Sequence, residues 1–194
     1  MVVIHFTAMD GPEVALARLC DPQTEVSAHY LVSSCGALTQ MVPEEDRAWH
    51  AGAGSWQGQD DINSRSIGIE LDNLGTHPFP EPQMAALEHL LRGIMTRWSI
   101  SASGVIGHSD MAPGRKCDPG PHFDWARLTR QGLAARLTAQ APKTIDLHSF
   151  TTCAQAAGYP QDTPFETLLA ATRLRTAPWR HGPLTSADYT LPFP

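Results

Sequence analysis

The sequence predicts an α/β or α+β domain over residues 1–140, because short strands alternate with helices along this part of the chain. Residues 2–6 and 67–71 are short apolar runs rich in β-branched residues, which is typical of strands. Residues 82–98 repeat their apolar side chains at the helical period and form the clearest helical pattern in the sequence.

The first elements follow in a simple order. Residues 2–6 predict a strand, and residues 12–20 predict a short helix that Asp10-Gly11-Pro12 opens. Residues 29–33 and 38–42 predict two further strands. The turn residues Ser34-Cys35-Gly36 between them favour a hairpin.

The second half of the domain begins with a long loop. Residues 43–66 are polar and turn-rich, and such surface segments are where binding residues concentrate. Beyond this loop the pattern predicts a strand, a helix, a strand, a Pro/Gly-rich loop and a helix, over residues 67–71, 82–98, 104–107, 108–123 and 123–137.

A linker at residues 141–143 separates the domain from a small helical segment, residues 144–194. Its helical patterns cover residues 147–157 and 165–175, and its end is rich in proline. A segment of about 50 residues is near the lower limit for independent folding, so we expect it to dock on the main body.

Composition excludes several classes of protein. The chain has 194 residues, 42% hydrophobic and 18% charged, which is typical of a soluble globular protein rather than a disordered one. The net charge is −6 and basic residues form no patch, so nucleic acid is not an expected partner. No apolar run approaches the ~20 residues of a membrane span. The absence of a signal peptide predicts a cytoplasmic location, with the periplasm or cell envelope as the alternative if a signal was removed.

The four cysteines form no C-x-x-C pair, which excludes a cysteine zinc knuckle. We expect reduced, packed thiols, although the sequence alone leaves three pairings open. The cysteines are Cys20, Cys35, Cys117 and Cys153.

Three polar residues indicate a metal site. His5 lies inside an apolar strand, His108 directly follows another, and Asp118 lies in the adjacent loop. Two imidazoles and a carboxylate brought together at strand ends suit a catalytic zinc, which takes three protein ligands. The alternative is that each histidine is a hydrogen-bonded residue of the core or a loop.

Glu70 interrupts the apolar strand at residues 67–71. Burial without a partner would raise the pKa of its carboxyl group, which suits a general base near neutral pH. The alternative is a strand-end residue that faces solvent beside Asp72.

Five sequence motifs, in order and with compatible spacing, resemble the zinc-dependent N-acetylmuramoyl-L-alanine amidases, the type-2 peptidoglycan amidases related to phage amidases and peptidoglycan recognition proteins. The resemblance extends over residues 1 to about 135, and the combination of motifs is specific. The motifs are VIHFTA (3–8), SAHYLV (27–32), AWHAG (48–52), NSRSIGIELDN (63–73) and GHSDMAPGRKCDPGPHFDW (107–125).

The resemblance implies a fold, an activity and a set of site residues. The fold would be a mixed sheet flanked by helices, and the reaction would be hydrolysis of the amide between N-acetylmuramic acid and L-alanine in peptidoglycan or an anhydro-muropeptide. His5, His108 and Asp118 match the ligands of Zn²⁺. Glu70 matches the acid that activates the attacking water, and Lys116 matches the basic residue whose positive charge stabilises the developing oxyanion.

Residues in the other motifs are expected at the substrate groove, with ordinary packing as the alternative. These are His29, Trp49, His50, Trp56 and Asn63. Cys117 neighbours the predicted ligand Asp118, and some animal relatives use a cysteine ligand. The alignment of the DPGP element favours Asp118 as the ligand here.

The C-terminal residues 146–194 faintly resemble a small peptidoglycan-binding module that has lost its last helix. A helical segment packed on the catalytic body is the alternative. Two other functions remain open at this point. One is a peptidoglycan recognition module without catalysis, and the other is a zinc peptidase that cuts within the stem peptide.

Overall fold

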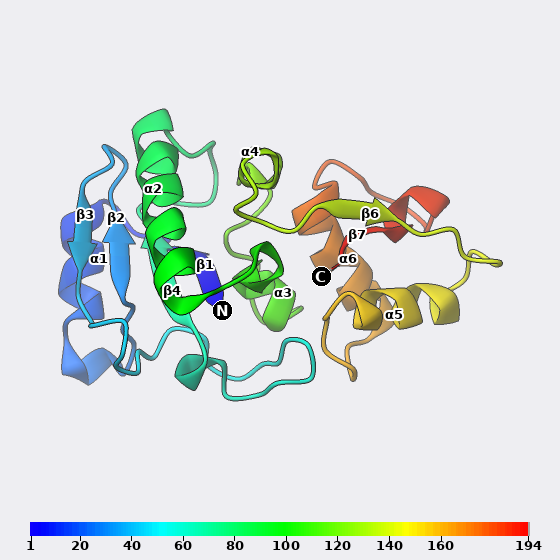
Figure 1. Cartoon of the computed structure of the whole chain (residues 1–194), viewed down its shortest axis with the longest axis horizontal. Coiled ribbons are helices and arrows are strands. Elements are labelled where there is room, and N and C mark those ends of the chain that lie inside the picture. The colour runs from blue at the N-terminus through cyan, green and yellow to red at the C-terminus, as the bar shows by residue number, and fades with distance from the viewer. Residues whose placement is uncertain (194) are drawn as a thin grey trace.

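A five-stranded mixed sheet forms the centre of the fold (Figure 1), and its strand order is β3-β2-β4-β1-β5. The structure, a computed structural model, describes residues 1–193. Strands β2, β4, β1 and β5 run parallel, and β3 pairs with β2 as the antiparallel hairpin that the turn residues predict. The strands are β1 (Val2–Phe6), β2 (Tyr30–Val32), β3 (Leu38–Gln40), β4 (Ile67–Leu71) and β5 (Val105–Gly107).

Strand β1 is central, and its apolar sequence explains its position. A parallel strand that is covered on both faces needs apolar residues at consecutive positions, and Val2, Val3 and Ile4 are fully buried. Val2 and Ile4 join the core beneath helix α2, whereas Val3 joins the core on the other face. Because side chains alternate along a strand, His5 projects to the same face as Val3.

Helices cover the sheet as the sequence predicts. Helix α1 (Pro12–Leu19) precedes β2, and helix α2 (Glu81–Trp98) packs its apolar stripe on one face of the sheet. None of the helices within residues 1–193 is long and apolar enough to cross a membrane. The stripe of α2 consists of Met84, Leu87, Leu90, Leu91 and Ile94.

Two predicted boundaries are wrong. The loop predicted over residues 108–123 begins with a short helix, α3 (His108–Met111). The helix predicted over residues 123–137 is limited to α4 (Trp125–Arg130), because the chain turns at Gly132, which has a φ of +71°. The chain then forms strand β6 (Leu137–Ala139) rather than continuing as a helix.

The C-terminal segment contains the two predicted helices, α5 (Leu147–Ala156) and α6 (Phe165–Thr176). For the end of the chain the sequence predicts only a proline-rich stretch that lacks the last helix of the module it resembles. Instead, strand β7 (Thr190–Pro192) pairs antiparallel with β6. Sequence reasoning could not find this pair, because its partners are about 50 positions apart and each is only three residues long.

The C-terminal segment packs against the face of the sheet opposite α2, and in Figure 1 helix α6 lies beside α3. A buried ion pair joins the two parts, since the Arg175 guanidinium lies 2.5 Å from the Asp110 carboxylate. The Tyr159 hydroxyl donates to the other Asp110 oxygen at 3.0 Å. Helix α3, which carries His108, is therefore fixed by residues of the C-terminal segment.

The four cysteine thiols are free, but they do not form the packed set that the sequence suggested. Cys153 is half-buried on α5. The other three are exposed, namely Cys20, Cys35 and Cys117.

Candidate metal centre

His5, His108 and Asp118 lie together at one edge of the sheet. His5 is near the end of β1, and His108 begins α3 directly after β5, which is parallel to β1. The carboxyl ends of neighbouring parallel strands meet at the same edge, so the two imidazoles are neighbours. The loop after α3 returns to the same place and supplies Asp118. All three side chains are buried, with 2%, 3% and 7% of their residue surface exposed.

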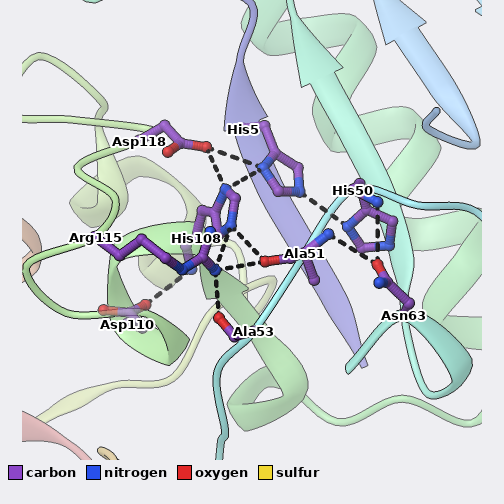
Figure 2. Close-up of polar contacts among 10 residues, drawn as sticks. His5, His50, Ala51, Ala53, Asn63, His108, Asp110, Arg115 and Asp118 are labelled. Atoms are coloured by element: carbon purple, nitrogen blue, oxygen red, sulfur yellow. Dashed lines mark hydrogen bonds and ion pairs between the residues drawn. The ribbon is translucent and has the colours of Figure 1, made fainter. Parts of the chain in front are cut away.

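One atom of each residue points to a common centre (Figure 2). The His5 and His108 Nδ1 atoms are 2.9 Å apart, and Asp118 Oδ2 lies 2.9 Å from the first and 3.0 Å from the second. Two imidazole nitrogens and one carboxylate oxygen are a typical donor set of a divalent metal ion.

The opposite nitrogens of the two rings have other partners. His108 Nε2 lies 2.9 Å from the Ala51 carbonyl oxygen, which can only accept, so Nε2 carries the proton and Nδ1 has the lone pair. His5 Nε2 lies 3.0 Å from Nδ1 of His50. This is the arrangement of metal-binding histidines, in which the second nitrogen is held by a hydrogen bond.

Charges in the cluster also suit a cation. Burial and the neighbouring His108 lower the pKa of His5 to about 4, against the effect of Asp118, so its ring is neutral at pH 7. Burial works to raise the pKa of Asp118, but its close contacts with the imidazoles of His108 and His5 hold that pKa well below its usual range. Electron pairs that converge at these distances repel one another unless a positive charge lies between them, and the residues therefore fit a metal ion.

Glu70 lies beside the cluster, because β4 pairs with β1 in a register that places Glu70 opposite His5. Its residue is half-buried, and its Oε2 atom is inaccessible and without a hydrogen-bond partner within residues 1–193. Burial, together with the negative charge of Asp118, raises the pKa of Glu70 to about 8, while Lys116 opposes the shift. An unpaired carboxyl group with a pKa near neutrality can accept and return a proton.

Lys116 lies on the loop between α3 and Asp118, and its side chain is exposed. Its charge lowers the pKa values of both Glu70 and His5, which places the ammonium group within electrostatic reach of the cluster. The structure gives this ammonium no hydrogen bond within residues 1–193. It is therefore free to interact with a bound molecule.

Residues 1–121 match the family model described as N-acetylmuramoyl-L-alanine amidase. The chain belongs to this amidase family. The fold agrees, since the solved structure of AmpDh3 from Pseudomonas aeruginosa superimposes with a TM-score of 0.87 at 28% identity, covering 98% of this chain and 88% of AmpDh3.

Two curated members of the amidase family are similar in sequence. AmiD of Escherichia coli is 42% identical over 156 residues, which cover 72% of this chain and 55% of AmiD. AmpD of Citrobacter freundii, a 1,6-anhydro-N-acetylmuramyl-L-alanine amidase, is 45% identical over 103 residues, which cover 53% of this chain and 55% of AmpD. The chain thus spans about half the length of each of these relatives.

A solved structure of AmiD from Escherichia coli includes the C-terminal segment in the match. It has a TM-score of 0.86 at 35% identity and covers 98% of this chain and 85% of that chain. That structure is a complex with the substrate anhydro-N-acetylmuramic acid-L-Ala-D-gamma-Glu-L-Lys.

His29 and His50, which the sequence predicts at the substrate groove, are both buried. His50 is buried against His5, and burial, then the neighbouring histidines, lower its pKa well below the usual value. His29 is also buried, and its ring accepts from the Gly68 N–H at 2.9 Å and donates to the Asp46 carbonyl at 3.0 Å. Both rings therefore have structural partners.

The other three expected groove residues differ in exposure. Trp49 is 54% exposed, with the Arg47 guanidinium 4.2 Å from its ring centre, so it can contact a bound molecule. Trp56 is buried and packs edge-to-face on Tyr159 of the C-terminal segment. Asn63 is buried, and its Oδ1 accepts from two backbone N–H groups of the 48–52 motif.

Sequence reasoning missed Arg115, which lies in the same motif as Lys116. Its Nη2 donates to the carbonyl oxygens of Ala51, at 2.6 Å, and of Ala53, and so joins the loop of Asp118 to the loop of His50. Its place beside Lys116 was the available signal. Cys117 is exposed, whereas Asp118 points into the cluster.

Proposed function

We propose that the protein is a zinc-dependent hydrolase that cleaves the amide between N-acetylmuramic acid and L-alanine in peptidoglycan or muropeptides. The observation that carries this proposal is the convergence of three metal-ligand atoms beside an unpaired buried carboxyl group. Membership of the amidase family and the muropeptide bound to AmiD support the choice of substrate.

His5, His108 and Asp118 would hold the zinc ion. When bound, zinc lowers the pKa of water to about 7 and polarises the scissile carbonyl group. The donor set alone suits several divalent ions, and zinc is proposed because the motifs resemble the zinc-dependent amidases.

Glu70 would act as the general base and then as the general acid. Its carboxylate takes a proton from the attacking water, whose oxygen bonds to the carbonyl carbon. The same proton passes to the alanine nitrogen as the C–N bond breaks, which leaves a lactyl carboxylic acid and a peptide with a free amine. At neutral pH the new acid ionises and the amine takes up a proton. A cation at the three ligands lowers the pKa of Glu70 from about 8 and keeps it deprotonated at neutral pH.

Lys116 would stabilise negative charge on the former carbonyl oxygen. Its exposed ammonium group is close enough for its charge to lower the pKa of Glu70, and it has no hydrogen-bond partner within residues 1–193. Such a preorganised charge contributes about 3 kcal/mol in other hydrolases.

The C-terminal segment extends the surface on which a substrate can lie. An open pocket of about 500 Å³ is lined by Lys116 and Cys117 on one side and by Thr167 and Ala171 of α6 on the other. A second pocket of about 550 Å³ has Arg115 on its wall. We propose that these hollows receive parts of the muropeptide outside the scissile bond.

The direct test combines metal content with product identity. The purified protein is analysed for zinc and incubated with anhydro-N-acetylmuramoyl-L-Ala-D-γ-Glu-L-Lys, and the products are identified by mass spectrometry. The expected result is one zinc per chain, a peptide-free sugar and the intact tripeptide. Cleavage within the peptide would indicate a peptidase, and intact substrate with bound zinc would indicate a recognition module.

A further inference from the structure

A two-residue segment, residues 50–51, contacts both predicted metal-ligand histidines. The His50 ring meets His5, with 3.0 Å between Nδ1 and Nε2, and the Ala51 carbonyl oxygen lies 2.9 Å from His108 Nε2. Figure 2 shows the segment on the side of the two rings opposite their convergent Nδ1 atoms. One segment therefore touches the far nitrogen of each imidazole.

The direction of the hydrogen bond to His5 follows from Ser66. The Ser66 hydroxyl donates its single proton to the Ile62 carbonyl at 2.6 Å, so it can only accept from His50 Nε2 at 3.3 Å. His50 then carries its proton on Nε2 and accepts on Nδ1. His5 donates from Nε2, and its Nδ1 lone pair points to the predicted metal position.

Two further residues hold the segment in place. The Asn63 Oδ1 atom accepts from the N–H of His50 at 3.0 Å and from the N–H of Ala51 at 2.8 Å. Strand β4 leaves room for the His50 ring only because Gly68 has no side chain, since a Cβ there would lie 2.4 Å from the ring. The ring is thus fixed by packing, and the backbone is fixed by one amide oxygen.

We propose that Asn63 is a positioning residue of the metal centre. By binding the backbone of residues 50–51, it sets the acceptors that hold His5 and His108 with Nδ1 toward the metal. This inference rests on the proposed function, and it assigns to Asn63 and His50 a role different from substrate contact.

The test measures zinc affinity by competition with a chelator. Asn63→Ala removes the shared acceptor and should weaken zinc binding by ~10–100-fold, the usual effect of losing an outer partner of a metal ligand. Asn63→Asp keeps an acceptor oxygen and should restore most of the affinity. Gln83→Ala is the matched control, because the buried Gln83 amide of α2 also makes two hydrogen bonds to backbone, at Val32 and Asp72, from the face of the sheet opposite His5. It should leave zinc affinity unchanged.

The outcomes separate this inference from the proposed function. If the wild-type protein binds zinc and Asn63→Ala binds it equally well, the positioning role is wrong while the amidase proposal stands. If the wild-type protein binds no zinc, both are wrong. Equal losses in Asn63→Ala and Gln83→Ala would reduce Asn63 to a general structural role and also overturn the inference.

A second measurement does not depend on the folding of any Asn63 variant. Nitrogen-15 NMR of the zinc-loaded wild-type protein reports which nitrogen of each imidazole ring carries the proton. We expect protonated Nε2 at His5, His50 and His108. In Ser66→Ala, His50 should lose the single preferred tautomer. A proton on Nδ1 of His5 in the wild-type protein would overturn the inference.

Discussion

The two sides of the metal centre differ in how their polar groups are paired. On the inner side, both ring nitrogens of His50 and the Asn63 side-chain oxygen have hydrogen-bond partners. On the open side, Glu70 has a buried oxygen without a partner, and Lys116 has no hydrogen bond within residues 1–193. Paired groups hold geometry, whereas unpaired groups are available to a reacting molecule.

This difference separates two kinds of residue that look alike in sequence. A buried polar group without a partner is destabilising by roughly 1–3 kcal/mol. Trp56 Nε1 and Gln83 Oε1 also lack partners within residues 1–193, but only Glu70 is a carboxyl group beside the metal-ligand cluster. By the same criterion His29 and His50, whose hydrogen-bond partners lie within the protein, belong with the paired groups, and substrate contact by them stays a prediction.

Loss of a ligand should have the largest effect. Asp118→Ala removes the only negative charge of the donor set and should weaken zinc binding by more than ~100-fold, the upper range for an outer partner, and abolish turnover. Metal analysis and muropeptide hydrolysis measure both effects. The matched control is Asp124→Ala, which removes the N-cap of α4 and an exposed ion pair with Arg130 and should keep zinc. Zinc retained in Asp118→Ala would contradict the ligand set.

Loss of the unpaired carboxyl group should leave the metal and remove catalysis. Glu70→Gln is expected to lower kcat by ~10²–10⁴-fold, the usual contribution of a general acid–base group, with zinc content unchanged. Glu81→Gln on α2 removes an exposed carboxylate paired with Arg127 and serves as the control. Full activity of Glu70→Gln would show that another group transfers the proton.

Loss of the free cation should be next in size. Lys116→Met is expected to lower kcat by ~10²–10³-fold, since it removes charge where the oxyanion develops. The KM for a muropeptide should change less than kcat, because the charge is needed more in the transition state than in the ground state. A change confined to KM would indicate that Lys116 only binds substrate.

Asp110 on α3 is also fully paired, because it contacts Arg175 and Tyr159 of the C-terminal segment. Breaking this ion pair should lower the stability of the protein. Arg175→Met leaves the Asp110 carboxylate buried without its ion-pair partner and should lower the free energy of unfolding by ~3–5 kcal/mol in a denaturant titration. Arg47→Met breaks the more exposed pair with Asp61 and should change it by less than ~1 kcal/mol. An equal decrease in the free energy of unfolding in the two variants would contradict a larger contribution from the buried pair.

The smallest expected effect is a change in how the stability of the metal-free protein depends on pH. The pKa of Glu70 is 4.5 when unfolded and about 8 when folded, so the folded state keeps a proton that the unfolded state has lost between these values. The wild-type protein should therefore lose stability relative to Glu70→Gln as pH rises from 4.5 to about 8, and the two should converge in their pH dependence below 4.5. A difference in melting temperature that is constant with pH would contradict a raised pKa.

Local patterns predicted the parts of the fold that local interactions determine. The buried run of β1, the strand around Glu70 and the apolar stripe of α2 follow from periodicity. The β6–β7 pair and the end of α4 depend on distant pairing and on the backbone of Gly132, which periodicity does not report.

The candidate site divides in the same way. The motifs identified His5, His108 and Asp118, because residue type and motif position carry that information. They could not show that His50 and Asn63 turn inward, because the direction of a loop side chain is set by its partners. Here those partners are Ser66, 16 positions from His50, and the backbone 12 and 13 positions from Asn63.

X-ray absorption spectroscopy of the zinc-loaded protein identifies the ligand atoms themselves. We expect nitrogen and oxygen atoms of the two imidazoles and the Asp118 carboxylate at about 2.0–2.1 Å from the metal, with no sulfur. A sulfur atom at about 2.3 Å would place Cys117 on the metal instead of Asp118 and would contradict the proposed ligand set.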